Sequence, residues 1–169
     1  MKNPNIKATA AVAIIRCEQP ITSYLLLRRA SHPEDPWSGH FSFPGGRKDP
    51  DDDTLLETCL RETREETGIQ LDTGQLIQTL QPEPAGHSFN HLLWVQPFLF
   101  SLSNRPSIIL EEKEIVNSSW VSAKEFASPS SHSETEMIPG RTFPTFPLQD
   151  YYLWGFTYKL LLKIIKLQE

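Results

Sequence analysis

The sequence GGRKDPDDD at residues 45–53, followed by RETREETGI at 61–69, decides the fold and the candidate site of this 169-residue chain. It places a glycine pair and an acidic loop directly before a predicted helix that carries three closely spaced glutamates. Like charges one helical turn apart destabilise a helix by roughly 0.2–0.5 kcal/mol per pair. The crowding of acid therefore indicates a positive ligand, and a divalent cation with oxygen ligands is the simplest candidate.

The residues after the acidic loop form the clearest predicted helix, which spans residues 54–67. Thr54 and Glu57 have the spacing of a capping box, in which a hydroxyl and a carboxylate accept hydrogen bonds from free backbone N–H groups. Gly68 follows the last turn and is typical of a helix C-terminus. One mostly apolar stripe runs along the helix, so we expect a sheet to cover that face, with the acidic stripe beside it. The apolar stripe consists of Leu56, Leu60, Thr63 and Thr67.

Glu62, Glu65 and Glu66 lie at positions i, i+3 and i+4 of this helix, so their carboxylates are expected to converge within about one turn. Together with Asp52 they form a candidate oxygen site for Mg²⁺ or Mn²⁺. Mg²⁺ keeps several waters and binds through few carboxylates plus substrate phosphates. Such coordination suits phosphate-ester chemistry, in which the ion neutralises charge and activates a water.

The backbone of the Gly45-Gly46 turn adds to this candidate site. Arg61 and Arg64 flank the acids, and bidentate pairing would orient them. For the helix alone a second interpretation stays open, namely an exposed face with ordinary Arg–Glu pairs. The glycine pair and Asp52 ahead of the helix favour the metal site.

The composition is that of an ordinary globular protein and indicates one domain over residues 1–169. The formal net charge of −5 argues against binding to nucleic acid, which needs a basic surface. No apolar segment has the length of a membrane span. The run at 8–15 resembles a weak signal peptide, but it breaks at Arg16 and fits a buried first strand better. Cys17 and Cys59 lack metal-ligand spacing, so we expect buried free thiols and a cytoplasmic protein.

Apolar runs and turn signals predict an α/β sandwich with a mixed sheet. The strand at 91–103 is apolar on both sides and is expected to be buried on two faces. His87 and His91 are expected in a loop or at the end of this strand. Residues 128–147 are rich in Ser, Pro and Thr and are predicted as a long loop, such as a lid. The predicted strands are 8–16, 21–28, 41–43, 75–80, 91–103 and 114–121, and the predicted helices are 54–67, 122–127 and 148–167.

The stretch from Gly46 to Ile69 resembles the signature of the Nudix hydrolases, which runs Gly, five residues, Glu, seven residues, then Arg-Glu-apolar-x-Glu-Glu-x-Gly-apolar. The sequence departs from that signature at three points. Asp52 replaces the first Glu, one residue is added before Arg61, and Thr63 stands at an apolar position. The resemblance implies a Nudix-type α/β/α sandwich with a mixed sheet and a catalytic loop-helix-loop.

Further segments are similar to the coenzyme A diphosphatase-like branch of that family, which shares the aspartate and the added residue. GHFSFPGG at 39–46 resembles its Phe-Pro-Gly-Gly segment. LWGFTY at 153–158 resembles the start of its C-terminal helix, and FPTF at 143–146 resembles the motif before it. The branch usually carries Leu-Arg-x-His-x-Gly upstream, associated with coenzyme A recognition. Here DPWSG at 35–39 occupies that place, and Trp37 stands where the His would be.

By this resemblance Glu62 and Glu66 are the principal metal ligands, and Glu65 is a third ligand or orients the water. Glu66 or Glu65 doubles as the general base, and Arg61 completes the catalytic set. In some family members the base comes from a later loop, which adds three reserve candidates. These are Glu111, Glu112 and Glu114.

The candidates for substrate contact are Arg28, His40 and the Gly45-Gly46 turn. His40 lies beside that turn, where it could contact a phosphate; a partly exposed strand residue is an equal interpretation. Arg28 and Arg29 end the second predicted strand, and arginines suit diphosphate binding, although strand-end arginines are often only solvated. Trp37 is open to stacking on a nucleobase or to ordinary packing.

Three functions stay open. The first is a Mg²⁺- or Mn²⁺-dependent pyrophosphohydrolase of the coenzyme A diphosphatase-like branch, acting on coenzyme A or a related nucleoside diphosphate derivative. The second is an ADP-ribose or nucleotide-sugar diphosphatase, motivated by the absent His motif. The third is a non-catalytic nucleotide-binding module, against which the complete set of acids argues. The family resemblance also makes a homodimer an expectation.

Overall fold

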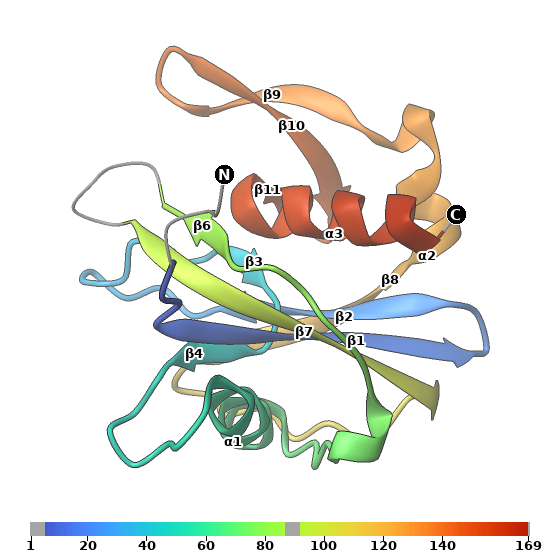
Figure 1. The fold of residues 1–169 in the computed structure, drawn as a ribbon. Coiled ribbons are helices and arrows are strands. Elements are labelled where there is room, and N and C mark those ends of the chain that lie inside the picture. The colour runs from blue at the N-terminus through green and yellow to red at the C-terminus, as the bar shows by residue number, and fades with distance from the viewer. Residues whose placement is uncertain (1–5, 87–91, 169) are drawn as a thin grey trace, which may run out of the picture.

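A computed structural model of the protein describes residues 6–86 and 92–168 (Figure 1). Within these residues eight strands form one mixed sheet. They are β1 (Ala10–Gln19), β2 (Ser23–Arg29), β3 (Phe41–Ser42), β4 (Gly45–Arg47), β5 (Leu76–Thr79), β6 (Glu83–Ala85), β7 (Leu93–Asn104) and β8 (Ile115–Ser122). The order is β3-β2-β1-β7-β5, with β4 beside β1, β6 beside β7 and β8 beside β2.

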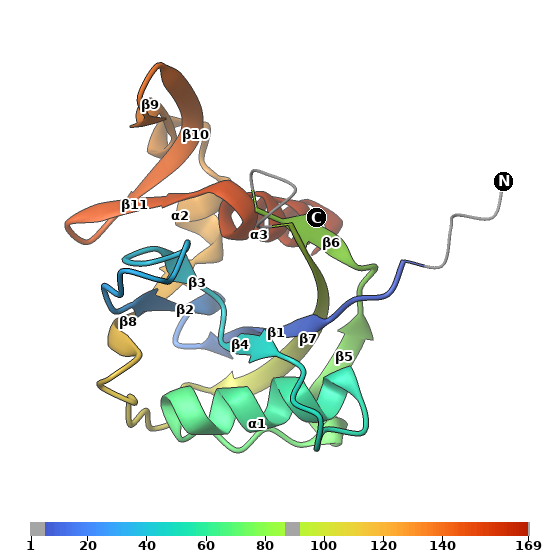
Figure 2. The same ribbon diagram turned by 90° about the vertical axis from the view of Figure 1, so that its left-hand side faces the viewer.

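Helices cover both faces of this sheet (Figures 1 and 2). The helix α1 (Leu55–Thr67) packs on one face, and α3 (Gly155–Gln168) and the short α2 (Ala123–Ala127) lie on the other. A smaller antiparallel sheet extends beyond α3 and consists of β9 (Ser133–Ile138), β10 (Arg141–Leu148) and β11 (Tyr151–Trp154). Two 3₁₀ turns, Thr73–Gln75 and Pro129–Ser131, complete the chain. The expected α/β/α sandwich is confirmed.

Strand β1 is the centre of the large sheet, and its successive side chains point to opposite faces. Ile15 packs in the core cluster on the α1 side, whereas Ile14 packs in the cluster on the α3 side. β1 pairs in parallel with β7, starting at Ala10 opposite Val95. Because helices cover both faces, β7 is buried on two sides, as its sequence predicts.

The ends of α1 agree with their sequence signals. Thr54 Oγ1 accepts a hydrogen bond from the Glu57 N–H (3.2 Å), and the Glu57 carboxylate accepts one from the Asp53 N–H (2.7 Å). Gly68 caps the C-terminus with φ 72°. The covered face is rotated from the predicted apolar stripe, since Leu56 and Leu60 are only half-buried. The buried residues are Thr58, Cys59, Thr63, Glu66 and Thr67.

Two predictions for the C-terminal part of the chain are wrong. Residues 128–147 do not form a long loop, because most of them form the hairpin of β9 and β10, which turns at Gly140 (φ 76°). The last helix does not begin at residue 148, because Tyr151–Trp154 pairs with β10 as a strand. Gly155, at φ 70°, separates this strand from α3.

The remaining expectations divide as follows. Gly45 and Gly46 were predicted as a turn, but they form β4 and pair with the start of β1. Cys17 and Cys59 are buried free thiols, as expected. His87 and His91 lie outside the described residues. No helix in the described ranges combines the length and the apolar character that a membrane crossing requires.

Candidate active site

Helix α1 directs two glutamates toward β4 at the edge of the sheet. Glu66 is 3% exposed, and the Glu62 side chain is 18% exposed. A Cβ atom on Gly46 would lie 2.7 Å from the Glu62 carboxyl carbon, so only glycine lets this carboxylate rest against the backbone. The Gly45 backbone N–H donates to the Glu66 carboxylate. The glycine pair is therefore the floor of an acidic site.

The two carboxylates are short of positive charge. Burial raises the pKa of Glu66 to about 8, and the charge of Glu62 adds to the rise, whereas Arg29 and the Gly45 N–H oppose it. Burial also raises the pKa of Glu62, against the hydrogen bond from Arg61. Desolvated neighbouring carboxylates hold a negative charge poorly unless a cation compensates them. The environment is thus one that a divalent cation would neutralise.

Arg61 holds three acids in fixed positions. Its Nε and Nη2 donate to the two oxygens of Asp52 at 2.9 and 2.8 Å, and its Nη1 donates to Glu62 at 3.0 Å and to Glu65 at 3.2 Å. Thr58 Oγ1 donates to Asp52 at 2.9 Å. These hydrogen bonds, that of Arg61 first, hold the pKa of Asp52 well below its usual range. Asp52 therefore orients Arg61 and does not itself line the site.

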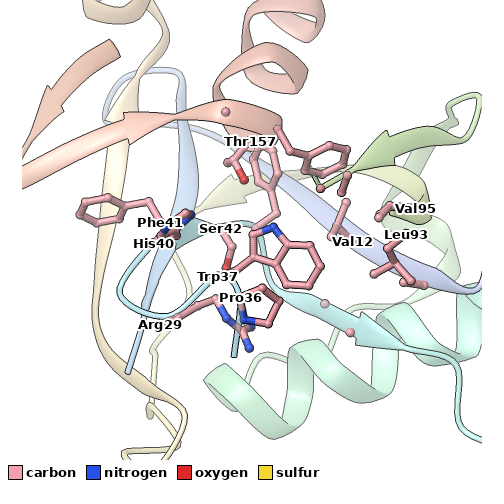
Figure 3. A pocket seen from close by; sticks show the side chains of 18 of the residues that line it. Val12, Arg29, Pro36, Trp37, His40, Phe41, Ser42, Leu93, Val95 and Thr157 are labelled. Atoms are coloured by element: carbon pink, nitrogen blue, oxygen red, sulfur yellow. The ribbon is translucent and has the colours of Figure 1, made fainter. Parts of the chain in front are cut away.

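The acidic pair lines a pocket of about 990 Å³, and Figure 3 shows other side chains that line it. From α1 and β4 the pocket passes the start of β1 and reaches β10 and α3. The polar end also contains Glu65, Glu114, Arg29, Arg47 and Lys113. The rest of the lining is mostly aromatic and apolar, with charged side chains of β6, β10 and α3 among it. The aromatic and apolar residues are Trp37, Phe143, Trp154, Phe156, Leu93 and Val95, and the charged ones include Glu83, Arg141 and Lys163.

Most of the residues predicted for the site line this pocket. They are Glu62, Glu65, Glu66, His40, Gly45 and Gly46, together with Glu114 from the reserve set of three loop glutamates. All three helix glutamates line the pocket, but they differ in burial, since Glu66 is buried and Glu62 is half-buried. Glu65 is 54% exposed and is paired with Arg61. Accordingly, no group of three or more metal-binding side chains is gathered within the described part of the chain.

Arg28 was predicted to contact substrate, but it does not line the pocket. Its Nε donates to the Gly39 carbonyl oxygen at 3.2 Å, its Nη1 contacts Asp150, and its guanidinium lies 4.8 Å from the Tyr151 ring centre. Side chains alternate along β2, so the next residue, Arg29, lies on the pocket side instead. Of the two arginines that end β2, Arg29 is therefore the one that lines the pocket.

Several pocket residues were missed by sequence reasoning. Nothing in the sequence marks Arg47 and Lys113 as pocket residues, because single cationic residues near a loop look like ordinary surface residues. Arg141 and Phe143 belong to the hairpin that was predicted as a loop. The Phe-Pro-Thr-Phe segment at 143–146 was the available signal, since it resembles a family motif.

The residues present fit a divalent cation. Glu62 and Glu66 offer hard oxygen ligands, and the pKa of each stays raised although Arg61 pairs with Glu62 and the charge of Arg29 acts on Glu66. A Mg²⁺ ion that keeps its waters and takes phosphate oxygens needs one or two carboxylates from the protein. Two carboxylates beside a pocket that also carries cations meet that requirement.

Residues 6–140 match the family model of the NUDIX domain. The chain belongs to the Nudix family. This Nudix chain is 29% identical over 150 residues to NudL of Yersinia pestis, described as an uncharacterized Nudix hydrolase; the match covers 88% of this chain and 73% of NudL. It is 30% identical over 138 residues to an uncharacterized protein of Schizosaccharomyces pombe, where the match covers 75% of this chain but 42% of the yeast protein.

Two solved structures share the fold of this Nudix chain. The NUDIX domain of Shewanella oneidensis NrtR, complexed with ADP ribose, has a TM-score of 0.63 at 15% identity, covering 98% of this chain and 91% of that one. A binary complex of the C. elegans Ap4A hydrolase has a TM-score of 0.54 at 25% identity, covering 70% and 82%. The first comparison supports the fold over nearly the whole chain.

Proposed function

We propose that this chain is a divalent-metal-dependent pyrophosphohydrolase that cleaves the diphosphate bridge of a nucleoside diphosphate derivative, with coenzyme A as the first candidate. The hydrolase class follows from the family and from the similarity to NudL. The observation that carries the proposal is the acidic pair of buried Glu66 and partly buried Glu62 against the Gly45-Gly46 backbone, in the wall of a pocket of ligand size.

Glu62 and Glu66 are assigned to hold Mg²⁺ or Mn²⁺, which when bound would neutralise phosphate charge and lower the pKa of a water. Arg61 keeps the Glu62 carboxylate in place by its hydrogen bond of 3.0 Å. Asp52 in turn fixes Arg61 from the far side. The arrangement is preorganised, because Arg61, itself fixed by Asp52, holds Glu62, and the Gly45 N–H of β4 holds Glu66.

In the reaction a water oxygen bonds to one phosphorus and the bond from that phosphorus to the bridging oxygen breaks, so the leaving group departs as a phosphorylated product. One carboxylate must accept the proton of the water. Glu65 is engaged by Arg61, which makes it a weaker acceptor. Glu114 lines the pocket, and its charge acts on both Glu62 and Glu66. We therefore assign the base to Glu114, with Glu65 as the alternative.

The diphosphate itself is assigned to the cations of the polar end. Arg29, Arg47 and Lys113 line this end. His40 also lines the pocket, with its ring centre 5.1 Å from that of Trp154. Guanidinium groups bind phosphate oxygens in pairs, which fixes the orientation of the bridge. Arg29 is held at Asp35 by contacts of 2.8 and 2.9 Å, so its position is set before substrate binds.

The leaving group is the part of the substrate that distinguishes the candidate activities. The family resemblance of the Phe-Pro-Gly-Gly segment favours coenzyme A, whereas Trp37 in place of the histidine favours ADP-ribose or a nucleotide sugar. The similarity to the C. elegans Ap4A hydrolase adds dinucleoside polyphosphates as a class. A non-catalytic role would leave the buried acidic pair without a purpose.

The test is hydrolysis by purified protein with Mg²⁺ or Mn²⁺ of coenzyme A, ADP-ribose, UDP-glucose and diadenosine polyphosphates. We expect at least one diphosphate to be cleaved and EDTA to stop the reaction. Glu66→Gln should reduce turnover by a factor of at least about 100. Glu125→Gln, on α2 and outside the pocket, is the matched control and should retain activity.

Glu114→Gln and Glu65→Gln separate the two candidates for the base. Loss of turnover in the first variant alone supports Glu114, and loss in the second alone reverses the assignment. If the wild-type protein binds these nucleotides but cleaves none of them with either ion, the enzymatic proposal fails in favour of a binding module.

A further inference from the structure

The loop between β2 and β3 is closed and internally bonded. At its base the Arg29 N–H donates to the His40 carbonyl oxygen at 2.9 Å. Within it, the His32 N–H donates to Ser38 Oγ at 2.7 Å, and the Ser38 N–H donates to the Asp35 carbonyl oxygen at 3.1 Å. These bonds give the loop a defined shape. This loop occupies the place of the absent coenzyme A motif.

Asp35 lies at the centre of this loop and uses both carboxylate oxygens. Its Oδ1 accepts the backbone N–H of Trp37 at 2.9 Å. Its Oδ2 accepts Arg29 Nε at 2.9 Å and contacts Arg29 Nη2 at 2.8 Å. One side chain therefore fixes two residues that line the pocket.

These two residues offer the pocket different chemistry. Arg29 lies at the polar end, where its charge acts on Glu66. Trp37 packs against the apolar cluster of Ala10, Ala85 and Val95. Figure 3 shows its indole reaching into the pocket, between Pro36 and the side chains of Val12, Leu93 and Val95.

The indole remains partly exposed, although it is surrounded by apolar side chains. A large aromatic ring that is packed on one side and open to a cavity on the other offers a flat surface to a ligand. Planar heterocycles stack on such rings through dispersion and desolvation. Aromatic platforms of this kind recognise a base by its face and tolerate changes at its edge.

We propose that Trp37 is a stacking platform for the nucleobase of the substrate, and that Asp35 positions it relative to Arg29, which binds the diphosphate. This inference rests on the proposed function and deepens it, because it states which part of the substrate the apolar end recognises. The substrate class is then a base-containing nucleotide, in which a planar ring and a diphosphate reach Trp37 and Arg29 together.

The first test measures binding without catalysis. The dissociation constants of AMP and of ribose 5-phosphate are measured by calorimetry in metal-free buffer, and their ratio reports the base contact. Trp37→Ala should weaken AMP binding about tenfold, while ribose 5-phosphate binding changes little. Trp37→Phe keeps an aromatic face and should stay within about threefold of the wild type.

Trp120→Phe is the matched control, because Trp120 packs on the α1 side of the sheet beside Arg105 and does not line the pocket. It should leave both dissociation constants unchanged. An AMP to ribose 5-phosphate ratio that is the same in Trp37→Ala and the wild type would overturn the platform. Circular dichroism of each variant verifies folding.

The second test separates the two contacts of Asp35. Asp35→Asn keeps an oxygen for the Trp37 N–H but loses the ion pair with Arg29, so it should preserve the AMP to ribose 5-phosphate ratio while raising the KM of the cleaved diphosphate. Asp35→Ala loses both contacts and should also reduce the ratio. Equal effects of the two substitutions on the ratio would remove Asp35 from its positioning role.

The AMP to ribose 5-phosphate ratio is measured without the proposed reaction. If the wild type cleaves diphosphates but Trp37→Ala leaves the ratio unchanged, only the platform fails. If the wild type binds AMP through Trp37 but cleaves no diphosphate, only the reaction fails.

Discussion

Arg61 grips Asp52 through two parallel hydrogen bonds, Nε to Oδ1 at 2.9 Å and Nη2 to Oδ2 at 2.8 Å. The aspartate replaces a longer glutamate of the family signature and is buried against Thr58. Its role is to orient the arginine that in turn orients Glu62. Aspartate in place of the signature glutamate is therefore compatible with the positions of the acids. Asp52 supports the site through Arg61 and does not itself line it.

This pair predicts a pH-dependent stability. The folded state lowers the pKa of Asp52, so its carboxylate stabilises the fold above the unfolded value of about 3.9, and that stabilisation is lost as the pH falls through the lower folded value. Asp52→Asn should therefore lower the Tm at pH 7 and have a smaller effect at pH 3. Asp51→Asn, at an exposed neighbour, is the control. An equal Tm difference at both pH values would contradict the prediction.

Substitution of the two glycines of β4 by alanine should affect different properties, turnover for Gly46 and stability for Gly45. A Cβ on Gly46 meets only the end of the Glu62 side chain, which can swing away, so Gly46→Ala should cost less than about 1 kcal/mol of stability but reduce turnover about 100-fold. A Cβ on Gly45 would lie 2.2 Å from the Ala11 backbone oxygen. Gly45→Ala should therefore destabilise the protein by about 3 kcal/mol.

Urea unfolding and a turnover assay of both variants check this contrast. If Gly46→Ala unfolds as easily as Gly45→Ala, the glycine at 46 serves packing and not the placement of a carboxylate.

We expect Glu66 to lower the stability of the metal-free protein, because its carboxyl group is buried beside Glu62. In metal-free protein at neutral pH, folding must protonate Glu66, because burial raises its pKa to about 8 while the unfolded chain keeps it ionised. Glu66→Gln removes this cost and should raise the free energy of unfolding by on the order of 1 kcal/mol. Adding Mg²⁺ should raise the Tm of the wild type, because the ion binds the folded state alone, and should raise that of the variant less. Glu125→Gln should behave as the wild type in both conditions. A Mg²⁺ response equal in Glu66→Gln and the wild type would exclude Glu66 as a ligand.

The neighbouring arginines of β2 should separate stability from binding. Arg28→Gln loses its contacts with Asp150, with the Gly39 carbonyl oxygen and with the Tyr151 ring, so the free energy of unfolding should fall by about 1–2 kcal/mol with KM unchanged. Arg29→Gln should instead raise KM about tenfold. Steady-state kinetics and denaturation of both variants decide the matter, and a reversed pattern would restore Arg28 as the substrate arginine.

Local signals account for what could be predicted. The limits of α1 follow from Thr54 and Gly68, because caps are set by a few neighbouring residues. The pairing of strands with alternating or continuous apolar residues is likewise readable, since burial on two faces leaves its mark on the sequence of β7. Within α1 the burial of Glu66 was not readable, because it depends on where the sheet lies.

The hairpin of β9 and β10 could not be predicted for a different reason. Pro144 and Pro147 lie in β10, the middle strand of its sheet, where a missing N–H normally argues against a strand. The sheet has three strands and lies beyond α3, so its stability depends on tertiary contacts such as Phe146 in the core next to Phe126. The aromatic wall of the pocket was hidden for the same reason.

The parallel pairing of β1 with β7 also fixes when the site can form. Ala10 lies opposite Val95, so the central strand gains its inner neighbour only after the chain has continued for some 85 further residues. The buried face of α1 packs in the cluster that both strands share. A nascent chain that stops before β7 would carry every residue of the acidic helix but would lack the part of the sheet face that β7 contributes beneath α1. Catalytic competence in this architecture is therefore a late event of folding, set by long-range contacts.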